Sequence, residues 1–156
     1  MKQIEKKEFN SEELEYMIIP NYKECKEFMN VYEIQFYHTL KEVVDLINKT
    51  DTSKHLALFC QVALNRLVEI NNKRIKNELL EFFHDRSIDF VLYDEISDKV
   101  YKCIELNGRG HKENPYIIER DKKLKNVFNF IDFKLLFIDE NRTYNIQDIY
   151  NKIEES

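Results

Sequence analysis

Two acidic residues stand in neighbouring strand-like runs whose other residues are mostly apolar. Asp89 opens the run "DFVLY", and Glu105 lies inside "YKCIELN". Hard cations such as Mg²⁺ take oxygen ligands, and they commonly use one or two carboxylates together with water and substrate phosphate. Such a site orients a water molecule and stabilises charge on a phosphoryl group. The two carboxylates therefore indicate a metal site, provided that the fold brings them together.

A β-hairpin would bring these carboxylates to one end of a sheet. The segment "DEISDK" between the two runs supplies turn-forming residues, and strand pairing across this turn places Asp89 near the level of Glu105. Because side chains alternate along a strand, Glu105 points to the same face as Asn107. A second interpretation stays open, in which Asp89 ends a strand and Glu105 is a surface residue paired with Lys102 or Arg109.

The pattern of apolar residues predicts an α/β (α+β) fold, with a mixed central sheet of about four strands flanked by helices. A long amphipathic helix is expected from residue 31, where Asn30 and Glu33 match a capping box. Strands are expected at 54–64, 89–93, 100–106 and 133–139, and further helices at 73–84, 115–130 and 145–155. Residues 1–29 are polar and acidic, and we expect a helical N-terminal appendage there, followed by one domain over residues 30–156.

Composition narrows the class of protein. The chain has 156 residues, of which 43% are hydrophobic and 34% charged, as in a single globular domain. The start of the chain lacks the apolar centre of a secretory signal, and no run is long enough to span a bilayer, so we expect a cytoplasmic protein without a membrane anchor. The net charge of -5 argues against a protein that coats nucleic acid through bulk electrostatics, although it is compatible with a local basic groove.

The sequence lacks the motifs of several other classes of enzyme. There is no GxSxG for a serine hydrolase, and two glycines are too few for a phosphate-binding loop or a dinucleotide fingerprint. The three cysteines contain no CxxC pair and lie in apolar surroundings, which is typical of buried free thiols in a reducing compartment. The four histidines show no zinc spacing. These absences leave the carboxylate pair as the strongest chemical signal.

The order of short motifs resembles the PD-(D/E)XK, or restriction-endonuclease-like, nuclease superfamily. More narrowly, it looks like a bacterial family of uncharacterised domains related to very-short-patch-repair endonucleases. The matching pieces, over about residues 30 to 150, are "EIQFYHTL", "ALFCQVAL", "SIDFVLYD", "CIELNGRGH", "ERDKKLKNVF" and "FKLLFID". The resemblance implies a restriction-endonuclease-like fold and a Mg²⁺-dependent endonuclease that hydrolyses nucleic acid, with DNA as the expected substrate.

The resemblance also implies a role for individual residues. Asp89 and Glu105 correspond to the ligands of Mg²⁺ or Mn²⁺, Glu33 to a helix glutamate that often joins them, and His111 to a histidine that acts on the attacking water or the leaving phosphate. The expected catalytic residues are Asp89, Glu105, His111, Glu33 and Asn107. The expected nucleic-acid-binding residues are Gln61, Arg109, Lys112, Arg120 and Lys122.

Each of these residues also has a purely structural interpretation. Glu33 is explained by the capping box, and Gln61 could satisfy a buried backbone group. Arg120 with Asp121 could form a solvated helix face, and His111 could be an exposed loop residue. Between residues 109 and 125 there are six Lys or Arg against three acids, which suits a basic rim for phosphate but also suits an exposed helix.

The sequence departs from the family pattern at residue 107, where the superfamily has lysine and the narrower family usually aspartate. Asn107 stabilises charge only through a neutral dipole. Two functions therefore stay open. The first is a metal-dependent nuclease that uses a metal-activated water. The second is a catalytically degenerate nuclease fold that acts through protein partners in a mobile-element or defence-related system, where the acidic N-terminal segment is expected to meet a partner or cover the basic rim.

Overall fold

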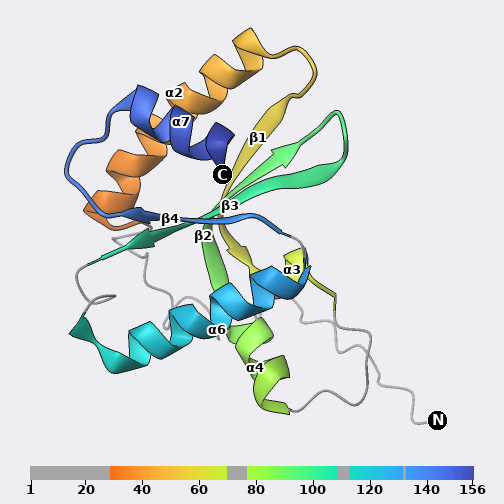
Figure 1. Ribbon diagram of the computed structural model, residues 1–156, viewed down its shortest axis with the longest axis vertical. Coiled ribbons are helices and arrows are strands. Elements are labelled where there is room, and N and C mark those ends of the chain that lie inside the picture. Colours follow the sequence, from red (N-terminus) through yellow and green to blue (C-terminus); the bar gives the residue numbers. More distant parts are fainter. Residues whose placement is uncertain (1–28, 70–76, 109–112, 132) are drawn as a thin grey trace, which may run out of the picture.

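The structure is a computed structural model that describes residues 29–69, 77–108, 113–131 and 133–156. Its elements are α2 (Val31–Thr50), β1 (Leu56–Ala63), α3 (Leu64–Leu67), α4 (Asn77–Asp85), β2 (Ser87–Asp94), β3 (Lys99–Asn107), α6 (Pro115–Ile131), β4 (Leu135–Asp139) and α7 (Ile146–Glu155). The predicted α/β (α+β) fold with a mixed sheet flanked by helices is confirmed (Figure 1). The predicted N-terminal appendage falls on residues 1–28, outside the described residues.

The sheet has the strand order β1-β2-β3-β4. β1 pairs antiparallel with β2, β2 pairs antiparallel with β3, and β4 lies parallel to β3. Tyr93 pairs with Val100 across the β2–β3 turn, so the expected hairpin is present. A parallel neighbour needs a crossover connection, and α6 provides it between β3 and β4. One prediction is corrected here, because the strand expected to reach Leu64 ends at Ala63 and the short helix α3 begins at Leu64.

Two hydrophobic cores lie against the sheet, and different helices cover them (Figure 1). The first core joins α2 and α7 to the sheet through buried residues such as Phe36, Ile149 and Ile104. The second core joins α4 and α6 to the sheet, with Phe83 and Leu124 among its members. Helices from distant parts of the chain therefore hold opposite sides of the same strands.

In both β1 and β2, two residues that regular alternation would place on one face belong to different cores. In β1, Cys60 packs against the first core, whereas Val62 packs against the second. In β2, Phe90 belongs to the first core and Ile88 to the second. The residue between Cys60 and Val62 is Gln61, whose φ of 51° lies in the left-handed region that is uncommon for a non-glycine residue. Such backbone outliers are concentrated at functional sites.

The start of α2 shows the expected capping box. The Asn30 side chain accepts hydrogen bonds from the backbone N–H groups of Tyr32 (2.9 Å) and Glu33 (3.0 Å), and the Glu33 carboxylate accepts one from Asn30 N (2.9 Å). These contacts satisfy backbone donors that have no partner inside the helix. The capping box therefore orients the Glu33 side chain at the first turn of α2.

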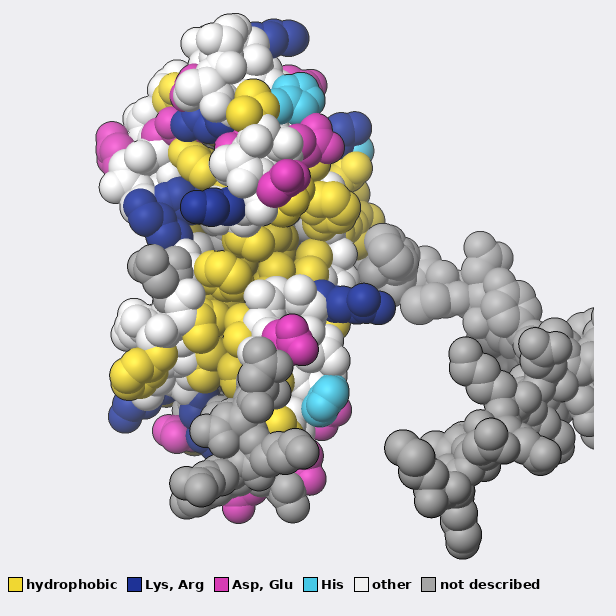
Figure 2. Space-filling model, turned by 90° about the vertical axis from the view of Figure 1, so that its right-hand side faces the viewer, with side chains coloured by type: hydrophobic (Ala, Val, Ile, Leu, Met, Phe, Trp, Pro, Cys, Tyr) yellow, Lys and Arg dark blue, Asp and Glu magenta, His cyan; other side chains and the backbone are white. Residues whose placement is uncertain are grey.

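Apolar side chains also gather on the surface, in the middle of the face that Figure 2 shows. The exposed apolar residues include Phe59 of β1, with 51% of its surface exposed, and Ile96 of the β2–β3 turn, with 60% exposed. β1 is an edge strand of the sheet, and edge strands present unpaired backbone groups. None of the helices in the described ranges has the length and apolar character needed to cross a membrane.

Replacement of Asn145 by alanine tests the N-cap of α7. The Asn145 side chain accepts a hydrogen bond from Asp148 N (3.1 Å) at the start of α7, whose Ile149 and Ile153 are buried in the first core. We expect Asn145→Ala to lower the free energy of unfolding by about 1 kcal/mol, which is typical of a lost N-cap. Urea denaturation measures this change, and Asn126→Ala, at an exposed position inside α6, is the control. Equal stability of the two variants would contradict the prediction.

Candidate functional site

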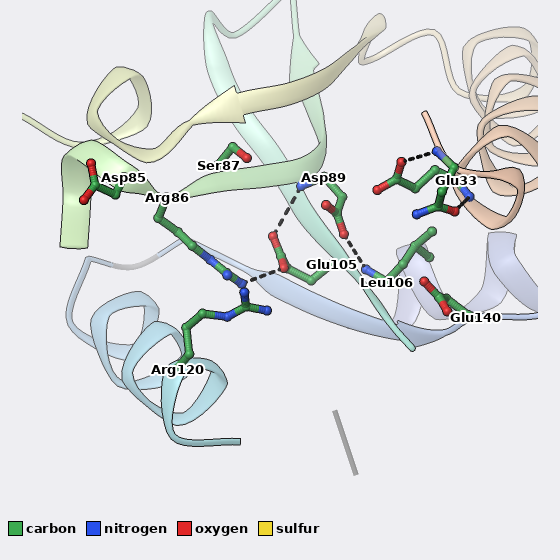
Figure 3. Close-up of a pocket in the computed structure, with 10 residues that line it drawn as sticks. Glu33, Asp85, Arg86, Ser87, Asp89, Glu105, Leu106, Arg120 and Glu140 are labelled. Carbon is green, nitrogen blue, oxygen red and sulfur yellow. Dashed lines mark hydrogen bonds and ion pairs between the residues drawn. The ribbon is translucent and has the colours of Figure 1, made fainter. Parts of the chain in front are cut away.

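An open cleft with a volume of about 380 Å³ lies where β2 begins and β3 ends (Figure 3). Its acidic lining residues are Glu33, Asp85, Asp89, Glu105 and Glu140. Its basic lining residues are Arg86 and Arg120. In Figure 3 the two arginines lie on one side of Glu105, and Glu33 and Glu140 lie on the other. The cleft therefore has an acidic centre with cationic groups at one side.

Asp89 and Glu105 meet at the centre of the cleft, as the hairpin predicted. Phe90 pairs with Ile104, so the residue before Phe90 lies level with the residue after Ile104 on the neighbouring strand. Asp89 N donates a hydrogen bond to Glu105 Oε1 (3.3 Å). The strand pairing therefore places two carboxylates side by side.

Glu105 is buried, with 3% of its surface exposed. Its Oε2 accepts a hydrogen bond from Arg86 Nη2 (2.9 Å). Burial and the nearby Asp89 carboxylate raise the pKa of Glu105 to about 8, although the Arg86 guanidinium acts in the opposite direction. A carboxyl group with such a raised pKa holds a proton near neutral pH. A raised pKa of this kind is a common property of functional carboxylates.

Asp89 is held in place by hydrogen bonds to both of its carboxylate oxygens. Oδ2 accepts one from Leu106 N (2.9 Å), and Oδ1 accepts one from Gln61 Nε2 (3.3 Å). The side-chain Oε1 of Gln61 accepts a hydrogen bond from Ser87 Oγ (3.1 Å). Gln61 is exposed and binds other side chains, so the interpretation that it serves a buried backbone group is wrong. The prediction that Gln61 lies near the carboxylates is confirmed.

Glu33 takes part in both of the interactions that the sequence suggested. Its Oε2 accepts the capping hydrogen bond from Asn30 N, and its Oε1 accepts a hydrogen bond from Gln61 Nε2 (3.5 Å). The same Gln61 nitrogen also reaches Asp89. Gln61 thus links the first turn of α2 to the carboxylate pair.

The sequence did not indicate several lining residues of the cleft, namely Asp85, Ser87, Glu140 and Arg86, of which Arg86 has the closest contact with the carboxylate pair. Its side chain is only 10% exposed, and its Nη2 lies 2.9 Å from Glu105 and 3.7 Å from Asp121 Oδ1. The interpretation of Glu105 as a surface residue paired with Lys102 is therefore wrong, because Glu105 is buried against Arg86. Lys102 Nζ instead donates to Ser156 Oγ (2.7 Å). A buried carboxylate requires a cationic or hydrogen-bonding partner, but the sequence contains no signal that names it.

Asp121 is buried as well, which corrects the interpretation of a solvated helix face. It lies on the inward face of α6 together with Leu124 and Phe128. That spacing of three and seven residues is a signal from which an inward position could have been inferred. Arg120 has 43% of its side chain exposed, lines the cleft, and lies 3.8 Å from Asp121 Oδ1. Lys122 is exposed on α6 and is not among the described lining residues.

The remaining predicted site residues lie at or beyond the end of β3. Asn107 lines an adjoining cleft of about 690 Å³ that shares Glu140 with the first. Its Oδ1 is buried and has no hydrogen-bond partner within the part of the chain that the structure describes. His111, Arg109 and Lys112 fall outside the described residues.

The donor set fits one hard cation with a mostly aqueous shell. Asp89 and Glu105 offer carboxylate oxygens, and Mg²⁺ is commonly bound through one or two carboxylates plus water and phosphate. Among residues 29–69, 77–108, 113–131 and 133–156, no group of three or more His, Cys, Asp or Glu side chains is arranged to hold a metal ion. A cage made entirely of protein ligands is therefore not formed by these residues, whereas a two-carboxylate site is compatible with them.

Comparison with known proteins adds one finding. A family model described as "Protein of unknown function (DUF2726)" matches residues 25–156. No curated protein and no solved structure matches the chain.

Proposed function

We propose that this chain, which belongs to the DUF2726 family, is a metal-dependent nuclease that hydrolyses phosphodiester bonds of nucleic acid. The observation that carries the proposal is the pairing of Asp89 with Glu105 in an open cleft beside two arginines. The resemblance of the motif order to the PD-(D/E)XK superfamily supports the same conclusion. DNA is the proposed substrate, and Mg²⁺ or Mn²⁺ is the proposed cofactor.

Asp89 and Glu105 would hold the cation, and each already has a defined orientation. Leu106 N and Gln61 Nε2 fix Asp89, while Asp89 N and Arg86 Nη2 fix Glu105. When bound, the cation supplies Lewis-acid activation of a water molecule and neutralises charge on the phosphate. The backbone N–H groups of Asp89 and Leu106 orient the two carboxylates before the cation binds, and preorganised groups of this kind need no rearrangement during the reaction.

The surrounding residues have supporting roles in this proposal. Arg120, which is partly exposed at the edge of the cleft, would contact a phosphate group of the nucleic acid. Gln61 would keep Glu33 and Asp89 turned towards the same space. His111 is proposed to act on the attacking water or the leaving phosphate, as the resemblance implies.

A second candidate function is favoured by the cationic partner of Glu105. Arg86 already binds one oxygen of this carboxylate, and Asn107 provides no charge at the position of the family's lysine or aspartate. In this alternative the nuclease fold has lost its activity and serves as a binding module for a protein partner, in a mobile-element or defence-related system. The acidic N-terminal segment would then contact that partner.

Metal titration separates the two candidates. Mg²⁺ and Mn²⁺ are titrated calorimetrically into the wild type, Glu105→Ala and Glu42→Ala, where Glu42 is an exposed glutamate of α2. The nuclease proposal predicts metal uptake by the wild type and Glu42→Ala, and its loss in Glu105→Ala, because a ligand is removed. Incubation of the same proteins with plasmid DNA, single-stranded DNA and RNA should give cleavage with the same dependence.

Absence of metal uptake and cleavage by a folded wild-type protein would overturn the nuclease proposal. A cooperative unfolding transition in urea, measured together with circular dichroism, establishes that each protein is folded. The binding-module alternative would then be pursued through protein partners of the full chain.

A further inference from the structure

Arg86 is a buried cation in the wall of the candidate site. It lies between α4 and β2, and its backbone carbonyl accepts a hydrogen bond from Leu64 N (2.8 Å). Only 10% of its side chain is exposed, although it is a lining residue of the cleft. Arginine is rarely buried to this extent unless it is paired, because burial removes the solvation of its charge.

The pairing of Arg86 leaves part of its binding capacity unused. Its Nη2 makes one short hydrogen bond, to Glu105 Oε2 (2.9 Å), while Asp121 Oδ1 lies further away at 3.7 Å. Its Nε is buried and has no hydrogen-bond partner among the residues that the structure describes. A guanidinium group carries five N–H donors in a planar fork that matches carboxylate and phosphate oxygens. Arg86 therefore has a donor that its present pairing does not use, and a further acceptor could reach it only after the side chain moves.

Arg120 adds a second guanidinium on the same side of Glu105 (Figure 3). It comes from α6, has 43% of its side chain exposed, and lies 3.8 Å from Asp121 Oδ1. Asp121 thus lies close to both arginines. The two guanidinium groups could bind oxygens of one phosphate, with Arg120 reaching it from the open side of the cleft.

The local charges explain why phosphate and a divalent cation would bind together. Three carboxylates (Asp89, Glu105 and Asp121) and two arginines (Arg86 and Arg120) are linked by hydrogen bonds and ion pairs around Glu105, so with Glu105 ionised, as metal binding requires, their formal sum is -3 + 2 = -1. The cleft carries further negative charge from Glu33, Asp85 and Glu140. A divalent cation offsets part of this negative charge, which would otherwise repel the phosphodiester. It also introduces a positive charge beside Glu105, which repels Arg86.

We propose that Arg86 occupies Glu105 in place of a divalent cation, and that binding of the cation releases Arg86 to bind a phosphate oxygen of the substrate together with Arg120. This inference rests on the proposed nuclease function. It assigns Arg86 as the cation that compensates for the neutral Asn107.

Metal affinity tests the exchange without any measurement of activity. Mg²⁺ is titrated calorimetrically into the full-length wild type, Arg86→Gln, Arg86→Lys and Arg120→Gln at about pH 9.5, where Glu105, with its pKa of about 8, is ionised. We expect Arg86→Gln to bind Mg²⁺ about tenfold more tightly than the wild type, because it removes the competing charge. Arg86→Lys keeps the charge and should stay within about threefold of the wild type. Arg66→Gln, at an exposed arginine of α3, is the matched control and should leave the affinity unchanged.

Phosphate binding tests the second half of the inference. Inorganic phosphate is titrated into each Mg²⁺-saturated protein, and Arg86→Gln and Arg120→Gln should each bind it at least about fivefold more weakly than the wild type and Arg66→Gln. A role of Arg86 in stability alone would lower the affinity for Mg²⁺, or leave it unchanged, when the charge is removed. The direction of the change therefore distinguishes the two roles.

The outcomes separate this inference from the proposed function. A wild type that binds Mg²⁺ while Arg86→Gln binds it equally or more weakly would overturn the exchange and leave the nuclease proposal intact. Unchanged phosphate affinity in both arginine variants would also overturn it. A wild type that binds no Mg²⁺ would overturn both proposals.

Discussion

The Asp89→Asn protein is expected to cleave nucleic acid at least about 10³-fold more slowly than the wild type, because metal stabilisation of the reaction is worth several kcal/mol and each 1.4 kcal/mol corresponds to a factor of ten. Asparagine has nearly the same shape as aspartate, and its carbonyl oxygen can still accept the hydrogen bond from Leu106 N, although the longer hydrogen bond from Gln61 Nε2 (3.3 Å) is lost. The substitution therefore removes the charge of one proposed ligand with little change in the fold. Mg²⁺ affinity should fall in parallel.

The matched control for this variant is Asp45→Asn, which removes one carboxylate from an exposed position of α2. Initial rates of cleavage of plasmid DNA and single-stranded DNA are measured for both variants, once at saturating Mg²⁺ and once at saturating Mn²⁺. Cleavage by Asp89→Asn at the wild-type rate would show that Asp89 does not hold the catalytic cation. Equal losses in both variants would show that any loss of charge lowers the rate and would contradict a specific role of Asp89.

The second large effect concerns stability and pH at Glu105. Burial and the neighbouring Asp89 raise the pKa of this carboxyl from its ordinary value of 4.5 to about 8 in the folded protein. Between these two values the folded protein holds a proton that the unfolded chain has released. The free energy of unfolding of the wild type should therefore fall as the pH rises from about 5 to about 8, by an amount on the order of 3 kcal/mol.

Glutamine at this position does not titrate, so Glu105→Gln should lose none of this stability. The free energy of unfolding is measured by urea denaturation at about pH 5 and about pH 8.5. Relative to the wild type, the free energy of unfolding of Glu105→Gln should be higher at about pH 8.5 than at about pH 5, by on the order of 3 kcal/mol. Glu42→Gln, at an exposed glutamate, should follow the wild type at both pH values. Parallel pH profiles of Glu105→Gln and the wild type would contradict the raised pKa. Saturating Mg²⁺ should restore stability at high pH to the wild type and Glu42→Gln but not to Glu105→Gln, because it binds the folded state of proteins that keep both carboxylates.

The parts of the fold that were predictable depend on local patterns. The β2–β3 hairpin followed from two apolar runs separated by turn-forming residues, and the start of α2 followed from Asn30 and Glu33. The end of β1 did not, because "ALFCQVAL" suits a strand throughout, and the chain turns into α3 only where Leu64 enters the second core. Tertiary packing contributes to that boundary, because Leu64 is fully buried in the second core.

The residues of the candidate site likewise fall into those that local patterns predict and those that only tertiary contacts bring to the site. Asp89 and Glu105 were predicted to meet because the hairpin and the alternation of side chains determine their positions. Arg86 and Asp121 come from a connection and from a helix outside the hairpin, and they reach Glu105 only through the three-dimensional arrangement of α4, α6 and the sheet. A single sequence carries no record of such long-range ion pairs.

The pairing of Phe90 with Ile104 has a consequence for how the protein is prepared and assayed. A slip of β3 by one residue would turn every side chain of the strand to the opposite face, so that Glu105 would enter the first core and Leu106 would replace it in the cleft. Misfolded molecules of this kind would lose the carboxylate pair while keeping most of their secondary structure. The stoichiometry of Mg²⁺ uptake would then count the correctly folded fraction of a preparation, which circular dichroism alone would overestimate.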